Sequence, residues 1–321
     1  MSVSHLIDPE LAPMMRILPV NDLTDIDGAR VKYAELVQLM QAQAPDPHVA
    51  RHDLVAPARG EHPAVKLRIF RPLGVEGSLP CVYWIQGGGY VLTSPAMDDQ
   101  WCEGIVSKHS CAVVSVDWRR APEHAFPAAS EDCYTGLAWV VREGERIGID
   151  ARRIVIAGHS SGGGSAASLA LLVRDRAEFS VAHQMLIYPM LDDRNDTPSS
   201  YQVTDANLWN RECNEIAWRH YLGPTYGTDN VSPYAAPARM RDLSGSIPAS
   251  ILTGGLDLFC DENVLYALRL MQAGVPTELH VYPGAPHGFD RIAPQASISR
   301  CFYAERDAII SRVFNAGSRQ A

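Results

Sequence analysis

The sequence has no long apolar run and no leading segment of the kind that directs a protein to a membrane. No stretch approaches the roughly 18 consecutive apolar residues that a membrane-spanning helix requires. The first residues, Met1 to His5, also lack the basic start and apolar core of a signal peptide. From these absences we expect a cytoplasmic protein without a membrane span.

Cysteine is sparse and scattered. The chain has 7 cysteines, an odd number, with no Cys-x-x-Cys pair and no cluster of cysteine with histidine. They are Cys81, Cys102, Cys111, Cys133, Cys213, Cys260 and Cys301. A disulfide framework would need paired spacings, so we expect reduced thiols in a reducing compartment.

An excess of positive charge is also missing. The chain has 37 acidic and 28 basic residues, a formal net charge of −9, and no long run of one sign, which argues against nucleic acid as a partner. What is present is typical of a globular protein: 46% hydrophobic and 20% charged residues. A chain of 321 residues fits one α/β domain with added cap segments.

Residues 154–164, Ile-Val-Ile-Ala-Gly-His-Ser-Ser-Gly-Gly-Gly, indicate a strand, a sharp turn and a helix. Ser160 has the Gly-x-Ser-x-Gly spacing of a nucleophile elbow, in which Gly158 and Gly162 must lack side chains so that strand and helix can close around it. Ser161 lacks that spacing. A glycine-rich turn without chemistry would share the pattern, but the flanking strand and helix favour an elbow that presents the Ser160 hydroxyl.

Three glycines follow directly after an apolar strand at 81–85. A flexible loop is one interpretation. The other is an oxyanion hole, in which backbone N–H groups hold the charge that develops on a carbonyl oxygen during acyl transfer. Because an elbow requires a second donor loop earlier in the chain, we predict an oxyanion hole. Its donors are the N–H groups of Gly88, Gly89 and Ser161.

Helix and strand patterns alternate along most of the chain, which predicts an α/β fold with a mostly parallel central sheet flanked by helices. The expected strands are 51–58, 65–70, 81–85, 112–116, 154–157, 184–188, 249–253 and 277–281. The expected helices of this body are 97–108, 128–143, a helix starting at 161, and 261–273.

Two segments break this alternation. Residues 1–45 predict an N-terminal cap of two helices, one around 11–18 and one from Asp27 to Gln43. The catalytic domain then covers 46–321, with a second cap insertion at 192–224 after the sixth strand. The aromatic-rich helix at 208–222 suits a lid and an ordinary amphipathic helix equally well.

Two later strand ends carry an acid and a histidine. Asp257 follows the strand at 249–253, and His287 lies in a loop after the strand at 277–281. Asp261 and Glu262 are better explained as acids in the first turn of a helix. The order Ser160, Asp257, His287 is that of the α/β hydrolases and not that of chymotrypsin or subtilisin.

With these motifs the chain resembles the hormone-sensitive-lipase-like esterases, also called bacterial family IV carboxylesterases, over nearly its whole length. The segment 117–128, Asp-Trp-Arg-Arg-Ala-Pro-Glu-His-Ala-Phe-Pro-Ala, is similar to the family's Asp-Tyr-Arg-Leu-Ala-Pro-Glu. The segment 282–289 is similar to its histidine loop. The resemblance implies an α/β-hydrolase fold and a Ser-His-Asp triad.

The chain departs from the family pattern at two motifs. Gln86 stands where the family has the histidine of His-Gly-Gly-Gly, and His159 and Ser161 replace the Asp and Ala of Gly-Asp-Ser-Ala-Gly-Gly. Neither change removes a backbone donor. In the family the first histidine braces the glycine loop, so we expect Gln86, together with Gly87, to support it through side-chain hydrogen bonds.

The implied activity is hydrolysis of short-to-medium acyl esters by Ser160, with no metal and no organic cofactor. The expected partner is a small-molecule ester, and a homodimer is the assembly we consider. An amidase or lactonase would use the same triad; a non-catalytic small-molecule binder of this fold would lose a triad member. Aromatic residues that either line an apolar pocket or pack in the core are Tyr90, Tyr188, Trp209, Trp218, Phe259 and Phe289.

Overall fold

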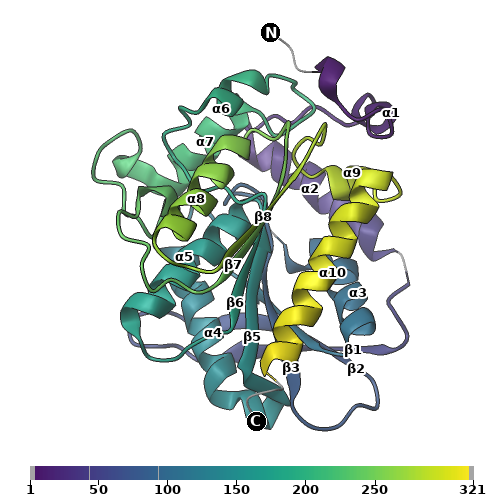
Figure 1. Cartoon of the computed structure of the whole chain (residues 1–321), viewed down its shortest axis with the longest axis vertical. Helices are drawn as coiled ribbons and strands as arrows, with labels where there is room; N and C mark the ends of the chain where they lie inside the picture. The colour runs from purple at the N-terminus through teal and green to yellow at the C-terminus, as the bar shows by residue number, and fades with distance from the viewer. Residues whose placement is uncertain (1–3, 43, 93, 318–321) are drawn as a thin grey trace.

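The computed structural model describes the chain except for residues 1–3, 43, 93 and 318–321. Its centre is an 8-stranded sheet with the strand order β1-β2-β4-β3-β5-β6-β7-β8 (Figure 1). β2 runs antiparallel to its neighbours β1 and β4, and the other pairs are parallel. The strands are β1 (Val49–Ala56), β2 (Val65–Pro72), β3 (Leu79–Ile85), β4 (Ala112–Asp117), β5 (Ile149–His159), β6 (His183–Ile187), β7 (Ala249–Gly254) and β8 (Thr277–Tyr282). The predicted mostly parallel sheet is confirmed.

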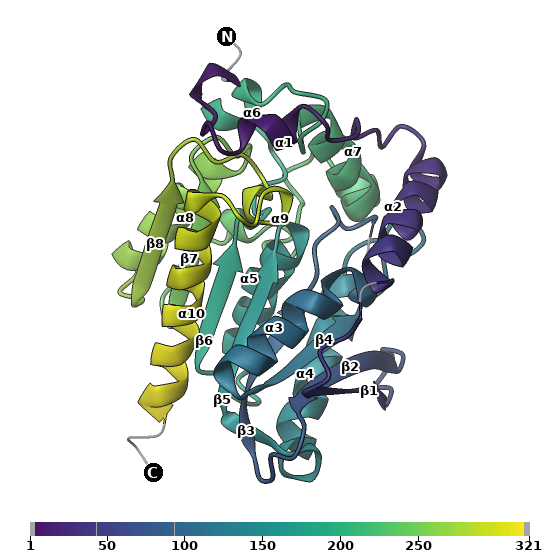
Figure 2. The same ribbon diagram turned by 90° about the vertical axis from the view of Figure 1, so that its right-hand side faces the viewer.

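Helices cover both faces of the sheet, and each face has its own core. Successive side chains of a strand point to opposite faces, so in β3 Val82 and Trp84 enter one core while Tyr83 and Ile85 enter the other. Figures 1 and 2 show α3, α9 and α10 on one face and α4, α5 and α8 on the other. These helices are α3 (Asp99–His109), α4 (Ala128–Ile147), α5 (Ser161–Arg176), α8 (Cys260–Gln272), α9 (Phe289–Ile292) and α10 (Ser297–Gly317).

The N-terminal segment and the chain between β6 and β7 lie together beyond the carboxyl ends of the strands (Figure 2). The backbone N–H of Asn21 donates to the carbonyl of Ala206 at 2.8 Å, and the Asn207 amide donates to the carbonyl of Leu18 at 2.6 Å. Their helices are α1 (Ala12–Met15), α2 (Ile26–Gln41), α6 (Pro198–Gln202) and α7 (Arg211–Leu222). Helix α1 is shorter than the predicted 11–18, and the predicted end at Gln43 lies outside the described residues.

Short 3-10 turns connect several of these elements. They are η1 (Ser4–Leu6), η2 (Pro95–Asp98), η3 (Gly223–Thr225) and η4 (Pro237–Arg239). η2 leads directly into α3 and brings Asp98 under the end of β5, where it becomes part of the site described below. The predicted helix at 97–108 thus begins as a 3-10 turn.

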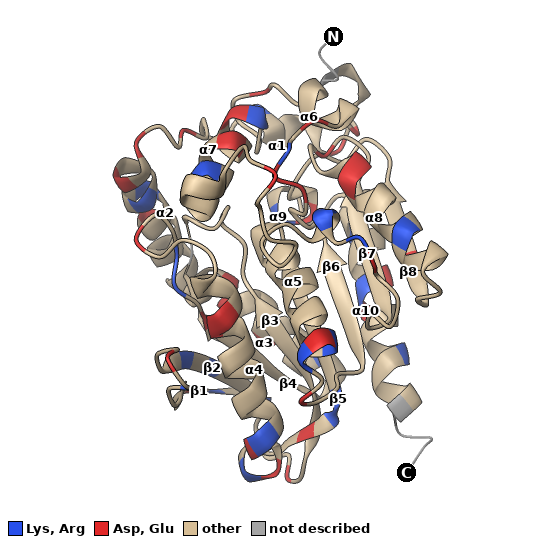
Figure 3. Ribbon diagram, turned by 90° about the vertical axis from the view of Figure 1, so that its left-hand side faces the viewer, with Lys and Arg blue, Asp and Glu red and all other residues tan. Residues whose placement is uncertain are grey.

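Charged residues of both signs are interspersed along the helices and loops of the ribbon (Figure 3). The central strands β3, β6 and β7 carry no Lys, Arg, Asp or Glu, as expected of strands covered on both faces. All seven cysteines fall within the described residues and none of them forms a disulfide. No helix in the described part of the chain is long and apolar enough to cross a membrane.

Candidate active site

Ser160 sits at the turn between β5 and α5 in a strained backbone conformation, with φ of 56° and ψ of −127°. A Cβ added to Gly158 would lie 2.4 Å from the carbonyl oxygen of Gly162, and one added to Gly162 would lie 2.1 Å from that of Ile85. Both contacts are too close for a side chain. The steric reason predicted for the glycines on either side of the serine is therefore present in the structure.

The structure brings Ser160, Asp257 and His287 together from three strand ends. The Oγ of Ser160 lies 3.0 Å from Nε2 of His287, and Nδ1 of His287 lies 2.7 Å from Oδ2 of Asp257. The other carboxylate oxygen of Asp257 accepts the N–H of Phe259 at 2.9 Å. A carboxylate at Nδ1 holds the ring proton there, which leaves Nε2 free to accept the proton of the serine hydroxyl.

The glycine loop approaches Ser160 with a backbone that only glycine adopts readily. Gly88 and Gly89 have φ of 124° and 58°. A Cβ on Gly88 would lie 1.5 Å from the carbonyl oxygen of Leu92, and one on Gly89 would lie 2.2 Å from the ring of Trp209. Among the described residues, the N–H groups of Gly88 and Gly89 donate no hydrogen bond. They are free to receive an oxyanion.

Ser161 supplies a third free donor. It is the first residue of α5, and the first N–H groups of a helix have no acceptor within the helix. The aligned peptide dipoles of α5 also favour negative charge at this end. The three donors predicted from the sequence are thus all unpaired at the same end of the sheet.

Gln86 does not brace the glycine loop, and that prediction is wrong. Its side chain is 1% exposed, and neither atom of its amide has a hydrogen-bond partner among the described residues. Instead, the N–H of Gly87 lies 3.0 Å from Nε2 of His159. The register explains the exchange: Ile85 pairs with Gly158 in the parallel sheet, which brings the residue after Gly158 beside the start of the loop.

His159 belongs to a buried polar cluster that the sequence did not reveal. Its Nε2 lies 3.1 Å from Oδ2 of Asp98, and that oxygen accepts the indole N–H of Trp84 at 2.8 Å. The other oxygen of Asp98 forms an ion pair with Arg291 at 2.6 Å. Burial alone would raise the pKa of Asp98, but Arg291 and His159 hold it below its ordinary value. The one signal in the sequence was the departure from the family motif at His159.

A second contact to the glycine loop comes from the cap. Arg30 of α2 donates to the carbonyl of Val91 at 3.0 Å and to that of Ala121 at 2.7 Å, and pairs with Glu123 at 2.5 Å. Ala121 and Glu123 belong to the segment 117–128 that resembles the family motif. This segment therefore ties the cap helix to the far end of the loop.

A family model described as the α/β-hydrolase fold matches residues 82–291, a range that includes the glycine loop, Ser160, Asp257 and His287. The chain belongs to the α/β-hydrolase family. Within it, this hydrolase is similar to an ethyl acetate hydrolase of Pseudomonas putida, with 31% identity over 86% of each chain. A carboxylesterase of Mycobacterium tuberculosis is 32% identical over 89% of this chain and 90% of the relative.

Solved structures of esterases share the fold along nearly the whole chain. A structure titled bacterial heroin esterase has a TM-score of 0.94 and 38% identity, and the match covers 98% of this hydrolase and 99% of that chain. A hyperthermophilic esterase from the archaeon Pyrobaculum calidifontis has a TM-score of 0.85 and 32% identity over 95% and 98% of the two chains. The resemblance to the hormone-sensitive-lipase-like esterases is confirmed.

Most of the predicted pocket aromatics are buried. Tyr90 is 1% exposed and stacks on Tyr221 with ring centroids 3.7 Å apart, and Phe289 is fully buried against Tyr282 and Phe302. We do not retain Tyr90 and Phe289 as pocket residues, because core side chains surround their rings. Trp218 is likewise fully buried.

Three other aromatics lie close to the reactive groups. Tyr188 and Phe259 contact the ring of His287 edge-on, with ring centroids 4.7 and 5.1 Å away. Trp209 is partly exposed and lies against Gly89 of the glycine loop. Its indole N–H is fixed by Asn214 at 3.2 Å. Of the predicted pocket residues, Trp209 is the one whose exposed surface adjoins the oxyanion donors.

The acids of the first turn of α8 do not face the triad. Asp261 accepts the N–H of Ser199 at 2.8 Å, and Glu262 accepts the N–H of Leu191 at 2.6 Å. Burial raises the pKa of Glu262 well above its ordinary value. Both carboxyl groups hold the start of the segment between β6 and β7, which adds a structural role to the predicted helix-dipole one.

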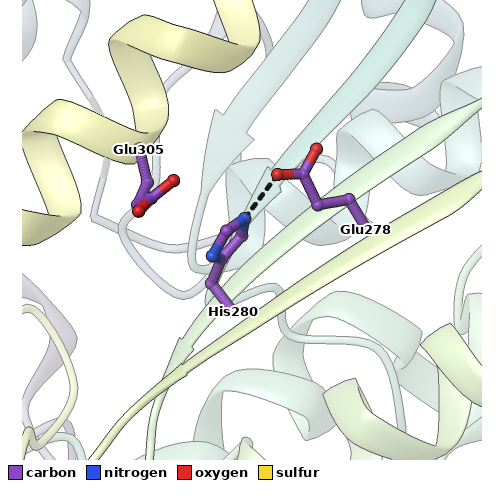
Figure 4. A group of neighbouring side chains, drawn as sticks. All are labelled: Glu278, His280 and Glu305. Atoms are coloured by element: carbon purple, nitrogen blue, oxygen red, sulfur yellow. Dashed lines mark hydrogen bonds and ion pairs between the residues drawn. The ribbon is translucent and has the colours of Figure 1, made fainter.

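A separate group of side chains has the types that metals bind. Ligand atoms of Glu278, His280 and Glu305 lie within 4.8 Å of one another, on β8 and α10 (Figure 4). Glu278 is already paired with His280 at 2.6 Å and with Arg312. A metal ion would have to displace Arg312 from Glu278, so we assign no metal to this group.

Proposed function

We propose that this hydrolase is a carboxylesterase that acts on short-to-medium acyl esters through an acyl-enzyme on Ser160. The observation that carries the proposal is the hydrogen-bonded series from Ser160 to His287 to Asp257, next to unpaired backbone donors at Gly88 and Gly89. The names of the relatives, ethyl acetate hydrolase and carboxylesterase, support an ester as the substrate.

The proposed reaction begins with attack of the Ser160 oxygen on the ester carbonyl carbon while Nε2 of His287 takes the hydroxyl proton. The carbon–oxygen bond to the alcohol then breaks, and His287 returns the proton to the leaving alcohol. Water attacks the acyl-enzyme by the same route in reverse and releases the acid and free Ser160. Asp257 keeps the imidazole in one tautomer and stabilises its charged form during both steps.

Backbone donors would stabilise the tetrahedral intermediates. In the proposed mechanism the N–H groups of Gly88, Gly89 and Ser161 donate to the carbonyl oxygen as it becomes negative, and each such donor contributes ~3 kcal/mol in related hydrolases. Because these donors are fixed before substrate arrives, no reorganisation is needed as the charge develops. A displacement of the glycine loop would therefore lower kcat more than it raises KM.

The reaction class is tested with matched substrates. A set of p-nitrophenyl esters of graded acyl length, with amides and lactones of the same acyl groups, should give the highest kcat/KM for short-to-medium esters. An organophosphate should stop the reaction, and mass spectrometry should place the label on the peptide containing Ser160. Faster turnover of the amides or lactones would replace the esterase assignment by one of those activities.

The preference for short substrates rests on the cap. The cap helices α1, α2, α6 and α7 lie over the carboxyl end of the sheet (Figure 2) and would limit the room for a long acyl chain. Soluble esters should therefore outperform emulsified long-chain triglycerides. A jump in activity when the substrate forms an emulsion would contradict this preference.

We propose a homodimer through α8 and β8. β8 is the last strand of the sheet, and an open strand edge pairs readily with another chain. Leu265 and Leu268 of α8 and Val281 of β8 are 52%, 47% and 44% exposed. Light scattering should give twice the chain mass, and Leu265→Glu with Leu268→Glu should give the monomer mass. A monomeric unmodified chain would contradict the proposal.

We also propose a cytoplasmic location. The support is chemical: the seven cysteines are unpaired, which suits a reducing compartment. Fractionation of the source cells should recover the esterase activity with cytoplasmic markers. Recovery outside the cytoplasm would overturn this assignment.

A further inference from the structure

We propose that His159 is a positioning residue of the oxyanion hole, holding the glycine loop in place through its neutral imidazole and releasing the loop when it is protonated. This inference rests on the proposed esterase function. His159 lies one residue before Ser160, at the end of β5. Its side chain is 13% exposed and forms no hydrogen bond with Ser160, Asp257 or His287 in the described structure.

Three contacts converge on one atom of His159. Its Nε2 lies 3.0 Å from the N–H of Gly87, 3.1 Å from Oδ2 of Asp98 and 3.3 Å from a guanidinium nitrogen of Arg291. Gly87 and Arg291 are donors, whereas Asp98 is an acceptor. A neutral Nε2 with a lone pair accepts from Gly87, and a protonated Nε2 donates to Asp98 instead. The two bonds exclude each other.

Packing keeps the imidazole against the loop. A Cβ on Gly87 would lie 2.7 Å from the His159 ring, so the ring and the peptide are in direct contact. Trp84 stacks on the other side, with ring centroids 5.6 Å apart, and Tyr188 contacts the ring edge at 6.2 Å. The bond to Gly87 requires the neutral tautomer with its proton on Nδ1 and a lone pair on Nε2, so a proton on Nε2 breaks it.

The charges around His159 favour its neutral form. Asp98 comes from η2, and Arg291 and Asp290 come from α9; Tyr188, at the end of β6, bonds Asp290 at 3.0 Å. The ion pair with Arg291 offsets the charge of Asp98, so Asp98 favours a proton on the imidazole less strongly. Burial lowers the pKa of His159 below its ordinary value, although Asp98 acts in the opposite direction. The neutral, bracing form is therefore present at neutral pH and is lost as the pH falls.

The consequence is a second protonation that inactivates the enzyme. His287 must be neutral to accept the serine proton, and His159 must be neutral to hold Gly87. Protonation of His159 should therefore add one to the slope with which log kcat/KM falls at acid pH. The loss should appear mainly in kcat, because a displaced oxyanion donor weakens binding of the transition state selectively.

Two substitutions separate these roles. His159→Gln keeps an acceptor that does not titrate, so it should retain kcat within a few-fold at neutral pH and reduce the acid slope by one. His159→Leu removes the acceptor and should lower kcat by about tenfold, less than the loss of a donor itself. His183→Leu is the matched control: His183 is also buried, but it bonds Ser250 at the opposite end of the sheet. It should lower stability without changing the slope.

A readout without turnover makes the test independent of the proposed esterase activity. Gln-Gly occurs once in the sequence, at Gln86-Gly87, so labelling glutamine with ¹³C and glycine with ¹⁵N isolates the Gly87 amide in an NMR spectrum. In Ser160→Ala, its proton shift should titrate with the His159 ring, and the titration should vanish in His159→Leu. The inference would be overturned if the Gly87 proton shift did not change at acid pH. Equal kcat values for His159→Leu and the unmodified enzyme would also overturn it.

Discussion

Two histidine–aspartate pairs lie side by side around Ser160. In the first, His287 faces the serine hydroxyl, and Asp257 also accepts the backbone N–H of Phe259. In the second, His159 faces the backbone of the glycine loop, and Asp98 is ion-paired with Arg291. The residue types are the same. The two pairs differ in the group that faces Nε2 of the histidine and in the partner of the aspartate, which is a backbone N–H for Asp257 and the Arg291 cation for Asp98.

This difference decides the chemistry of each imidazole. In the proposed mechanism Asp257, which pairs with no arginine or lysine among the described residues, stabilises the charged ring that forms when His287 takes a proton. An aspartate paired with arginine loses much of that effect, so its histidine serves as a fixed acceptor. Tyr188 contacts both rings, with centroids 4.7 Å from His287 and 6.2 Å from His159. The two pairs are thus separate in role while sharing a neighbour.

The largest effect is expected from removing the Ser160 hydroxyl, which faces His287 of the first pair. Ser160→Ala should lower kcat by about 10⁶, as loss of the nucleophile does in other serine hydrolases, and should abolish organophosphate labelling. Ser161→Ala is the control and should keep substantial activity, because only its backbone N–H is required. Labelling that persists in Ser160→Ala would remove this serine from the mechanism. Steady-state kinetics on one soluble ester measures both variants.

The next effect contrasts the two carboxylates directly. Asp257→Asn should lower kcat by about 10⁴, because the wrong tautomer then faces Ser160, with little change in stability. Asp98→Asn should lower kcat far less, but it removes the carboxylate that pairs with the partly buried Arg291 and should reduce the free energy of unfolding by about 3 kcal/mol. Kinetics and urea unfolding of the two variants give both numbers. Equal kcat losses would break the distinction between the pairs.

A third buried carboxyl group, Glu262, sharpens the comparison because no histidine or cation bonds it in the described structure. Its pKa in the folded protein is raised by burial, so its contribution to stability is full below its unfolded pKa and falls as the pH rises through the folded pKa. Glu262→Gln should remove that fall and be more stable than the unmodified chain at alkaline pH by about 1 kcal/mol. Unfolding curves at several pH values test this, and an unchanged pH dependence would contradict it.

The smallest effect is expected at Gln86. Its buried amide has no hydrogen-bond partner in the described part of the chain, so Gln86→Met should leave kcat within twofold and should leave stability unchanged or raised by about 1 kcal/mol. Gln86→Ala, which also leaves a cavity, is the comparison for packing. A fall in kcat for Gln86→Met at unchanged KM would restore Gln86 as a brace of the glycine loop.

The sequence alone determined the chain's repeating pattern and the residues that meet at the strand ends. Alternating helix and strand patterns predicted the parallel sheet. The glycine spacing selected Ser160 over Ser161, because steric limits on a tight turn depend on residues that are close in sequence. The long helix α10 was not predicted, although it packs Phe302, Ile309 and Phe314 into the core.

Tertiary structure alone decided which side chains serve the site. Gln86 precedes the glycine loop in the sequence, whereas His159 lies beside it in space. Only the register of β3 against β5 shows that His159 makes the hydrogen bond to the Gly87 N–H. Asp98 and Arg291 come from distant segments, and nothing local marks them as partners of His159. Tyr90 and Trp209 are both aromatic, but burial assigns one to the core and leaves the other beside Gly89. Such contacts depend on how separate elements pack, which no single stretch of sequence encodes.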